Sequence, residues 1–222
     1  ISIKEVFSDI IVEAPLGSRT KLTLPDGTLV WLNAGSRITY SQGFGVGNRK
    51  IELIREGYFE VKRNEEVPFL VKTNSLLVKV LGTKFNFRDY PDDAEAIVSL
   101  SEGKVALNNL LKKEKEAFLL PNERVVLNKK NGRMHVEYST VSNALQWTNG
   151  YLFFDEELLP DVVKELERSY NVKIQIASDT LNTFRFYGNF VHREQNIQEV
   201  LEALSATRKI HYIIEGHNIT LY

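Results

Sequence analysis

The sequence contains no cysteine, so neither disulfide bonds nor thiolate metal sites can form. An absence of cysteine does not fix the compartment, although it is compatible with an oxidising one. The chain also has only four histidines, which leaves few imidazole groups for catalysis or metal binding. No apolar run approaches the roughly 18 residues that a membrane span needs, and no signal-peptide pattern opens the sequence.

The sequence also lacks an excess of charge of either sign. Its formal net charge is −1 at pH 7, and it has no dense patch of lysine and arginine interleaved with aromatic residues. This argues against nucleic acid as a partner. A hydrophobic content of 43% with 26% charged residues is ordinary for a globular protein, and 222 residues suffice for one large domain or two modest ones.

Residues 1–140 alternate apolar and polar positions in one short run after another, which predicts an all-β first domain. Turn-forming sequences such as Pro25-Asp26-Gly27-Thr28 and Asn131-Gly132 separate the runs. A sandwich, a roll and a solenoid-like stack all fit this pattern. The glycines of residues 43–47 suggest a phosphate loop by composition, but the extended residues on both sides favour a hairpin loop.

Residues 76–107 form the predicted centre of this domain. They hold three or four strands, which we interpret as a meander. Leu76, Val78 and Val80 share one face of the first strand. Gly82 interrupts the apolar pattern, so we expect a bulge or a close backbone approach there. Nothing in this stretch resembles a catalytic site, and we interpret it as core.

Residues 141–222 change period and predict a small α+β second domain. A strand, a helix that begins near Leu158 and ends near Asn171, and another strand form a first unit. A second strand–helix–strand unit follows, and Asn196 and Glu199 form its helix-capping signal. One constant offset superposes a series of apolar positions, which indicates an internal duplication. The matching pairs are Leu159 with Ile197, Val162 with Val200, Val163 with Leu201, Leu166 with Leu204, Val172 with Ile210, Ile174 with Tyr212 and Ile176 with Ile214. We expect both helices to lie on one sheet.

Several motifs follow one another along the chain, among them LPDGT at residues 24–28, LGTKFNF at residues 81–87, LSEGKV at residues 100–105 and WTNG at residues 147–150. In this order they resemble FecR-type anti-sigma factors, specifically the periplasmic region found in Bacteroidetes-like chains. The repeated C-terminal unit is similar to the secretin-and-TonB N-terminal (STN-like) domain. One departure lies at Arg55-Glu56-Gly57-Tyr58-Phe59, where the family usually has Gly-Glu-Ala-x-Phe, and we expect an edge strand to be shaped differently there.

The resemblance implies signal transduction and no enzymatic activity. It implies the periplasmic sensor part of a single-pass inner-membrane protein, which couples a TonB-dependent outer-membrane transporter to an extracytoplasmic-function sigma factor by protein–protein binding. The implied partner is the N-terminal signalling domain of the transporter. The sigma factor and the membrane are expected to be reached only through a cytoplasmic segment and an N-terminal helix that are missing from this sequence. No cofactor is implied.

The residues themselves indicate no catalytic, cofactor-binding or metal site. We interpret the four histidines (His135, His192, His211 and His217) as surface residues of strands. His211 and His217 flank a predicted hairpin, but no third ligand accompanies them. We instead predict a partner-binding strand at the border of the second domain's sheet. It consists of Ile219, Thr220, Leu221 and Tyr222. A proline at Thr220 is then expected to weaken binding and leave the fold intact.

An alternative hypothesis makes the β domain a carbohydrate-binding module of a cell-envelope protein. Trp31, Tyr40 or Phe44 would then stack on sugar rings. An exposed aromatic platform in the structure distinguishes this hypothesis from the first. A hydrolase is a weaker third hypothesis, because no carboxylate pair can be placed on facing strands.

Overall fold

A computed structural model describes residues 8–222, which divide into two compact units. Unit 1 contains the chain up to Ala14 and Arg19–Leu145, and unit 2 contains Pro15–Ser18 and Gln146–Tyr222. The predicted boundary between residues 140 and 141 lies near this division, but nothing in the sequence pattern groups residues 15–18 with the second unit. Residues 1–7 of the predicted first domain lie outside the described residues. None of the helices within residues 8–222 is long and apolar enough to cross a membrane.

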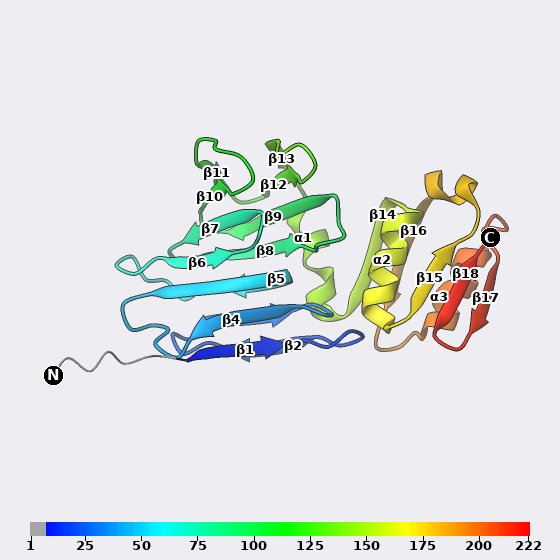
Figure 1. The fold of residues 1–222 in the computed structure, drawn as a ribbon, viewed down its shortest axis with the longest axis horizontal. Coiled ribbons are helices and arrows are strands. Elements are labelled where there is room, and N and C mark those ends of the chain that lie inside the picture. The colour runs from blue at the N-terminus through cyan, green and yellow to red at the C-terminus, as the bar shows by residue number, and fades with distance from the viewer. Residues whose placement is uncertain (1–7) are drawn as a thin grey trace. The chain divides into compact units, whose positions relative to one another are not determined.

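Unit 1 is built of strands, followed by one short helical turn, α1 (Val141–Ala144) (Figure 1). The strands are β1 (Asp9–Glu13), β2 (Thr20–Thr23), β3 (Leu29–Leu32), β4 (Arg37–Ser41), β5 (Arg49–Glu60), β6 (Phe69–Lys72), β7 (Leu76–Val80), β8 (Lys84–Asp89), β9 (Glu95–Glu102), β10 (Val105–Asn109), β11 (Ala117–Leu119), β12 (Glu123–Asn128) and β13 (Met134–Tyr138).

The strands of unit 1 form two layers that share β5. One layer contains β1, β4, β6, β7, β10 and β11, and the other contains β2, β3, β8, β9, β12 and β13. Buried side chains from both layers pack into a single hydrophobic core. Of the architectures that the sequence left open, unit 1 is therefore a sandwich.

β5 passes from one layer to the other at Arg55. Ile54 pairs with Arg37 of β4, whereas Arg55 pairs with Asp89 of β8 in the other layer. Arg55 has a φ of +77°, a left-handed conformation that favours glycine. The glycine of the family pattern suits this position. The prediction of an edge strand here is wrong, because β5 is the strand common to both layers.

The predicted meander of residues 76–107 is wrong in its pairing, although four strands are present. β7 pairs with β6 and β10, whereas β8 pairs with β5 and β9, so the chain changes layer at Gly82 and again at Gly103. A Cβ at Gly82 would lie 2.7 Å from the Cβ of Arg63, which confirms the expected close backbone approach. A Cβ at Gly103 would lie 2.8 Å from the carbonyl oxygen of Gly82. The two corners therefore pack against each other, and both require glycine.

A buried ion pair joins the LPDGT turn to the start of β5. Nη1 of Arg49 lies 3.1 Å from Oδ2 of Asp26, and only 2% of the Arg49 side chain is exposed. Asp26 also accepts hydrogen bonds from the backbone N–H and the hydroxyl of Thr28, both at 2.9 Å. The guanidinium donates in addition to three carbonyl oxygens of the segment after β5, those of Lys62, Asn64 and Val67. Both charges are thus paired and hydrogen-bonded, as burial requires.

Unit 2 contains the predicted duplication (Figure 1). After the 3₁₀ turn η1 (Gln146–Asn149), the first copy is β14 (Tyr151–Leu158), α2 (Leu159–Tyr170) and β15 (Lys173–Ile176). The 3₁₀ turn η2 (Asp179–Thr183) leads to the second copy, β16 (Arg185–Val191), α3 (Ile197–Ser205) and β17 (Tyr212–Glu215), and β18 (Asn218–Leu221) ends the unit. The expected helix ends are confirmed: Pro160 lies in the first turn of α2, Asn171 ends α2 with a φ of +52°, and Asn196 and Glu199 form a capping box.

The strands of unit 2 form two sheets, so the expectation of one sheet is wrong. β14 pairs with β16, and β18 lies between β15 and β17. Each sheet therefore combines strands from both copies of the duplicated unit. Buried side chains of both helices and both sheets pack into one core.

We expect Asp26→Ala to lower the free energy of unfolding by about 3–5 kcal/mol, because it leaves the buried Arg49 guanidinium without its carboxylate. Glu65→Ala is the matched control, since Glu65 pairs with Arg63 at the surface and its loss should cost at most about 1 kcal/mol. Urea-induced unfolding of the three proteins measures both changes. Equal losses for the two variants would contradict the structural importance of the buried pair.

We expect Arg55→Gly to be more stable than Arg55→Ala by about 1 kcal/mol, because alanine at a positive φ remains strained. Both variants lose the hydrogen bond from the Arg55 guanidinium to the carbonyl oxygen of Gly35, so the comparison isolates the backbone. Inside an ordinary strand, the alanine variant would be the more stable of the two. Thermal unfolding of the two variants is the measurement, and an alanine variant that is as stable as the glycine variant would rule out strain at this bend.

Candidate functional site

The C-terminal hairpin of unit 2 leaves one strand edge open. Gly216, with a φ of +64°, and His217 connect β17 to β18 in a tight two-residue turn. β18 pairs with β15 on one side and with β17 on the other. Among the strands of residues 8–222, β17 pairs with β18 alone. We call the open side of Tyr212–Glu215 the β17 edge.

The backbone groups of alternate residues point out of the β17 edge. The N–H of His211 donates to the carbonyl oxygen of Tyr222 at 2.9 Å, and the N–H of Tyr222 donates back at 3.0 Å. Because antiparallel pairs alternate between bonded and non-bonded, the backbone groups of Ile213 also face β18. Those of Tyr212 and Ile214 therefore face the open edge, where they can pair with a further strand.

The side chains along the β17 edge are apolar and accessible. Ile213 is 50% exposed and lies opposite Thr220 on the outer face of the sheet. Ile214 is 39% exposed and lies opposite the buried Ile219. The only charged side chain of the strand is that of Glu215, at its end. An edge of this kind readily accepts a strand from another chain.

Two other sheet borders in unit 2, those of β14 and β15, carry features that hinder strand pairing. β14 has a bulge at Asp155 and Glu156, and Glu156 has a φ of +55°. Nη1 of Arg185, on the paired strand β16, donates to the carbonyl oxygen of Glu156 at 2.6 Å. A hydrogen bond to the Glu156 carboxylate raises the pKa of the Tyr187 hydroxyl. β15 begins with Lys173, and bulges and charges of this kind keep edges from pairing.

The predicted partner-binding residues 219–222 do not lie at the border of a sheet. β18 is the central strand, and Thr220 lies opposite both Gln175 of β15 and Ile213 of β17. The border placement is wrong because an alternating pattern identifies a strand without identifying its neighbours. Whether Ile219, Thr220, Leu221 and Tyr222 take part in partner binding stays a prediction. The Thr220 N–H faces Ile213, so a proline there would disrupt the sheet itself.

The four histidines are spread over unit 1 and unit 2. His211 and His217 lie at opposite ends of the β17–β18 hairpin. The ring of His192 packs on that of Tyr170, with centroids 4.7 Å apart. His135 lies on β13, with Nε2 3.5 Å from Oε2 of Glu137. Within residues 8–222, no three side chains of histidine, aspartate or glutamate are placed to hold a metal ion.

The aromatic residues of the carbohydrate hypothesis pack into unit 1. Phe44 is only 3% exposed, and its ring centroid lies 5.5 Å from that of the half-buried Tyr40. Trp31 is also half-buried and packs on Tyr58, with centroids 5.3 Å apart. Nζ of Lys21 lies 4.5 Å above the Trp31 ring. These contacts do not favour a shared aromatic platform for sugar.

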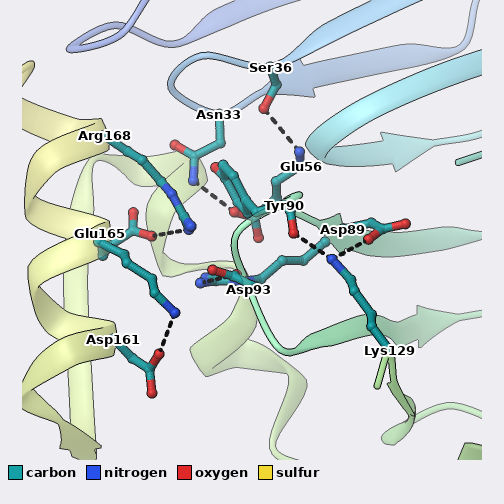
Figure 2. Close-up of polar contacts among 12 residues, drawn as sticks. Asn33, Ser36, Glu56, Asp89, Tyr90, Asp93, Lys129, Asp161, Glu165 and Arg168 are labelled. Atoms are coloured by element: carbon teal, nitrogen blue, oxygen red, sulfur yellow. Dashed lines mark hydrogen bonds and ion pairs between the residues drawn. The ribbon is translucent and has the colours of Figure 1, made fainter. Parts of the chain in front are cut away.

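A cluster of polar side chains in unit 1 was not predicted from the sequence (Figure 2). Glu56, in the first part of β5 after the bend, accepts hydrogen bonds from the side-chain amides of Asn33 and Asn86, both at 2.9 Å. Its backbone N–H donates to Oγ of Ser36 at 3.0 Å. Figure 2 also shows Lys129, whose Nζ lies 2.7 Å from Oδ1 of Asp89. The only signal in the sequence was that Asn86 belongs to LGTKFNF, one of the motifs on which the family resemblance rests. The contacts give these residues a structural explanation without catalysis.

Comparisons with known proteins agree with this organisation. A family model described as FecR protein matches residues 11–106, and one described as FecR, C-terminal matches residues 151–221. One crystal structure of a candidate anti-sigma factor from Parabacteroides distasonis ATCC 8503 is 33% identical, with a TM-score of 0.86 over 96% of this chain and 98% of that chain. A second, with the same description, is 32% identical, with a TM-score of 0.87 over 97% and 99% of the two chains. No curated protein matches the chain.

The two-unit fold and these similarities define a regulatory protein of the anti-sigma class. The chain belongs to the FecR family of anti-sigma factors. Membership implies signal transduction and interaction with a sigma factor and regulatory partners. The family is regulatory, and the expectation that this chain catalyses no reaction stays a prediction.

We expect proline at Thr220 to destabilise unit 2 by about 2 kcal/mol or more, because it removes a ladder donor from a central strand. Proline at Ile214 should cost little more than alanine at Ile214, because the Ile214 N–H faces the open edge. Thermal unfolding and amide hydrogen exchange of Thr220→Pro, Ile214→Pro and Ile214→Ala provide the measurement. If proline at Ile214 proves as costly as proline at Thr220, β17 is not an edge.

Proposed function

We propose that this chain is the periplasmic, signal-receiving part of an anti-sigma factor, and that it couples a TonB-dependent outer-membrane transporter to an extracytoplasmic-function sigma factor. Its partner is the N-terminal signalling domain of the transporter. A cytoplasmic segment binds the sigma factor, and a single helix anchors the full-length protein in the inner membrane. Family membership supports the regulatory role. The β17 edge is the observation that carries the docking step.

Unit 2 receives the transporter domain by strand addition at the β17 edge. The outward N–H and C=O groups of Tyr212 and Ile214 supply main-chain hydrogen bonds to an extended segment of the partner. Ile213 supplies exposed apolar surface on the outer face. The neighbouring borders of unit 2 carry a bulge and charges, so this one edge is the site that best fits such a partner.

The assignment of unit 2 as an STN-like domain and the Bacteroidetes-like origin of the chain belong to this proposal as well. The order of its elements, two strand–helix–strand copies followed by β18, supports a duplicated domain of this kind. Unit 1 then provides the sandwich that connects the receiving domain to the membrane helix. The contacts of Trp31, Tyr40 and Phe44 do not favour carbohydrate as the ligand of unit 1.

We expect the chain to bind the transporter's signalling domain with micromolar or tighter affinity in a calorimetric titration. Ile214→Pro should weaken this binding at least about tenfold, because proline has no backbone N–H and the partner strand therefore loses one main-chain hydrogen bond. Val136→Pro is the matched control: Val136 is 44% exposed on β13, a border strand of unit 1, and its backbone groups also face outward. The control should bind like the unmodified chain.

Three outcomes would speak against this proposal in different ways. An equal loss of affinity in the two proline variants would remove the docking site from the β17 edge. Full binding by a fragment that ends at Leu145 would move the site to unit 1. An absence of binding, together with retention of the chain on a polysaccharide gel, would replace the transporter by the carbohydrate hypothesis.

A further inference from the structure

The β17 edge is complementary to a second copy of itself. We propose that two copies of this chain pair through their β17 edges, antiparallel and related by a two-fold axis, so that one sheet continues across both. This inference goes beyond the proposed function, because it concerns the chain alone and needs no transporter. A two-fold contact uses the same surface patch on both copies, and that patch must therefore fit itself.

The direction of the backbone groups restricts the register of such a pair. Tyr212 and Ile214 direct their N–H and C=O groups outward, so they must form the hydrogen-bonded pairs of the new ladder. Pairing Tyr212 of one copy with Ile214 of the other uses every outward group of the strand. The two-fold axis then passes between the two Ile213 residues, which face each other as a non-hydrogen-bonded pair.

The side chains favour the same register. At the axis, two isoleucines that are each 50% exposed in the single chain come into contact on the outer face and lose water. On both sides of them, the same register places Glu215 of one copy opposite His211 of the other. A carboxylate opposite an imidazole is a complementary polar pair, and symmetry provides it twice. The patch thus has an apolar centre and matched polar ends.

The neighbouring registers fit less well. A shift of one residue places outward backbone groups opposite inward ones, and the ladder cannot form. A shift of two residues in one direction places the exposed Ile213 opposite the Glu215 carboxylate. A shift of two residues in the other direction places Ile213 opposite His211 and leaves Ile214 opposite the buried Ile210, beyond the end of the strand. The centred register alone combines full backbone pairing with apolar contact at the axis.

Self-pairing has a regulatory consequence, and this step rests on the proposed function. The Tyr212 and Ile214 groups that pair with a second copy are the same groups that we assign to docking of the transporter domain. One edge cannot hold both partners at once. Paired copies are therefore closed to the transporter, and a bound transporter domain keeps the copies apart.

The absence of cysteine allows a direct test. Ile213→Cys places one thiol in each copy at the axis, where non-hydrogen-bonded residues have Cα atoms about 4.5 Å apart, within the range that a disulfide spans. Tyr222→Cys is the matched control, because Tyr222 is 49% exposed but follows the end of the neighbouring strand β18, away from the axis. Mild oxidation of each variant, followed by non-reducing electrophoresis, should give a dimer at least about tenfold faster for Ile213→Cys than for Tyr222→Cys.

A second variant separates paired copies from chance collisions. Adding Ile214→Pro to Ile213→Cys removes an outward donor and should lower the rate of cross-linking to that of the Tyr222→Cys control. Equal cross-linking rates for the two cysteine variants, or no effect of the proline, would overturn the inference. If those results accompany tight binding of the transporter domain, self-pairing alone is rejected. Rapid, proline-sensitive cross-linking in a chain that binds no transporter domain rejects the proposed function and retains the dimer.

Discussion

The fold of unit 1 depends on the position of one buried guanidinium, that of Arg49. Arg49 is the first residue of β5, and it joins the LPDGT turn to the segment that follows the same strand. The hydroxyl of Thr28 adds a further link, since it donates to Asp26 and accepts from the backbone N–H of Lys62. Because β5 belongs to both layers, fixing its first residue helps to position the strand that the two layers share.

A second constraint is that the chain must cross between the layers without breaking the core. The crossings at the left-handed Arg55, at the crowded Gly82 and at Gly103 place special requirements on the backbone. The two glycine corners pack on each other and lie in the motifs LGTKFNF and LSEGKV. The family resemblance of unit 1 therefore rests largely on residues that shape the sandwich. The candidate interaction site lies elsewhere, on a hairpin of unit 2 whose edge side chains are largely exposed.

Residue patterns predicted the elements well and their neighbours poorly. Period-two alternation, Pro160, Asn171 and the Asn196 capping box determine local conformation, and each of these features holds in the structure. Alternation shows which residues share a face, but it does not show which strand lies alongside. The prediction of a meander was therefore wrong, because β7 and β8 belong to different layers. The prediction that residues 219–222 form a sheet border was wrong for the same reason. β18 pairs in parallel with β15, which is distant in the sequence. The β17 edge could be recognised only after β18 had been placed.

The central position of β18 also determines when unit 2 can be completed during synthesis. Among the strands of residues 8–222, β15 pairs with β18 alone, and the whole second copy of the duplicated unit separates the two in the sequence. The three-stranded sheet therefore has to wait for β18, whereas every strand of unit 1 within the same residues has been synthesised well before that point. When all of unit 1 has emerged from the ribosome, the three-stranded sheet of unit 2 still lacks its central strand, β18. Folding is thus progressive along the chain for unit 1, but it is delayed for unit 2 until β18 has emerged.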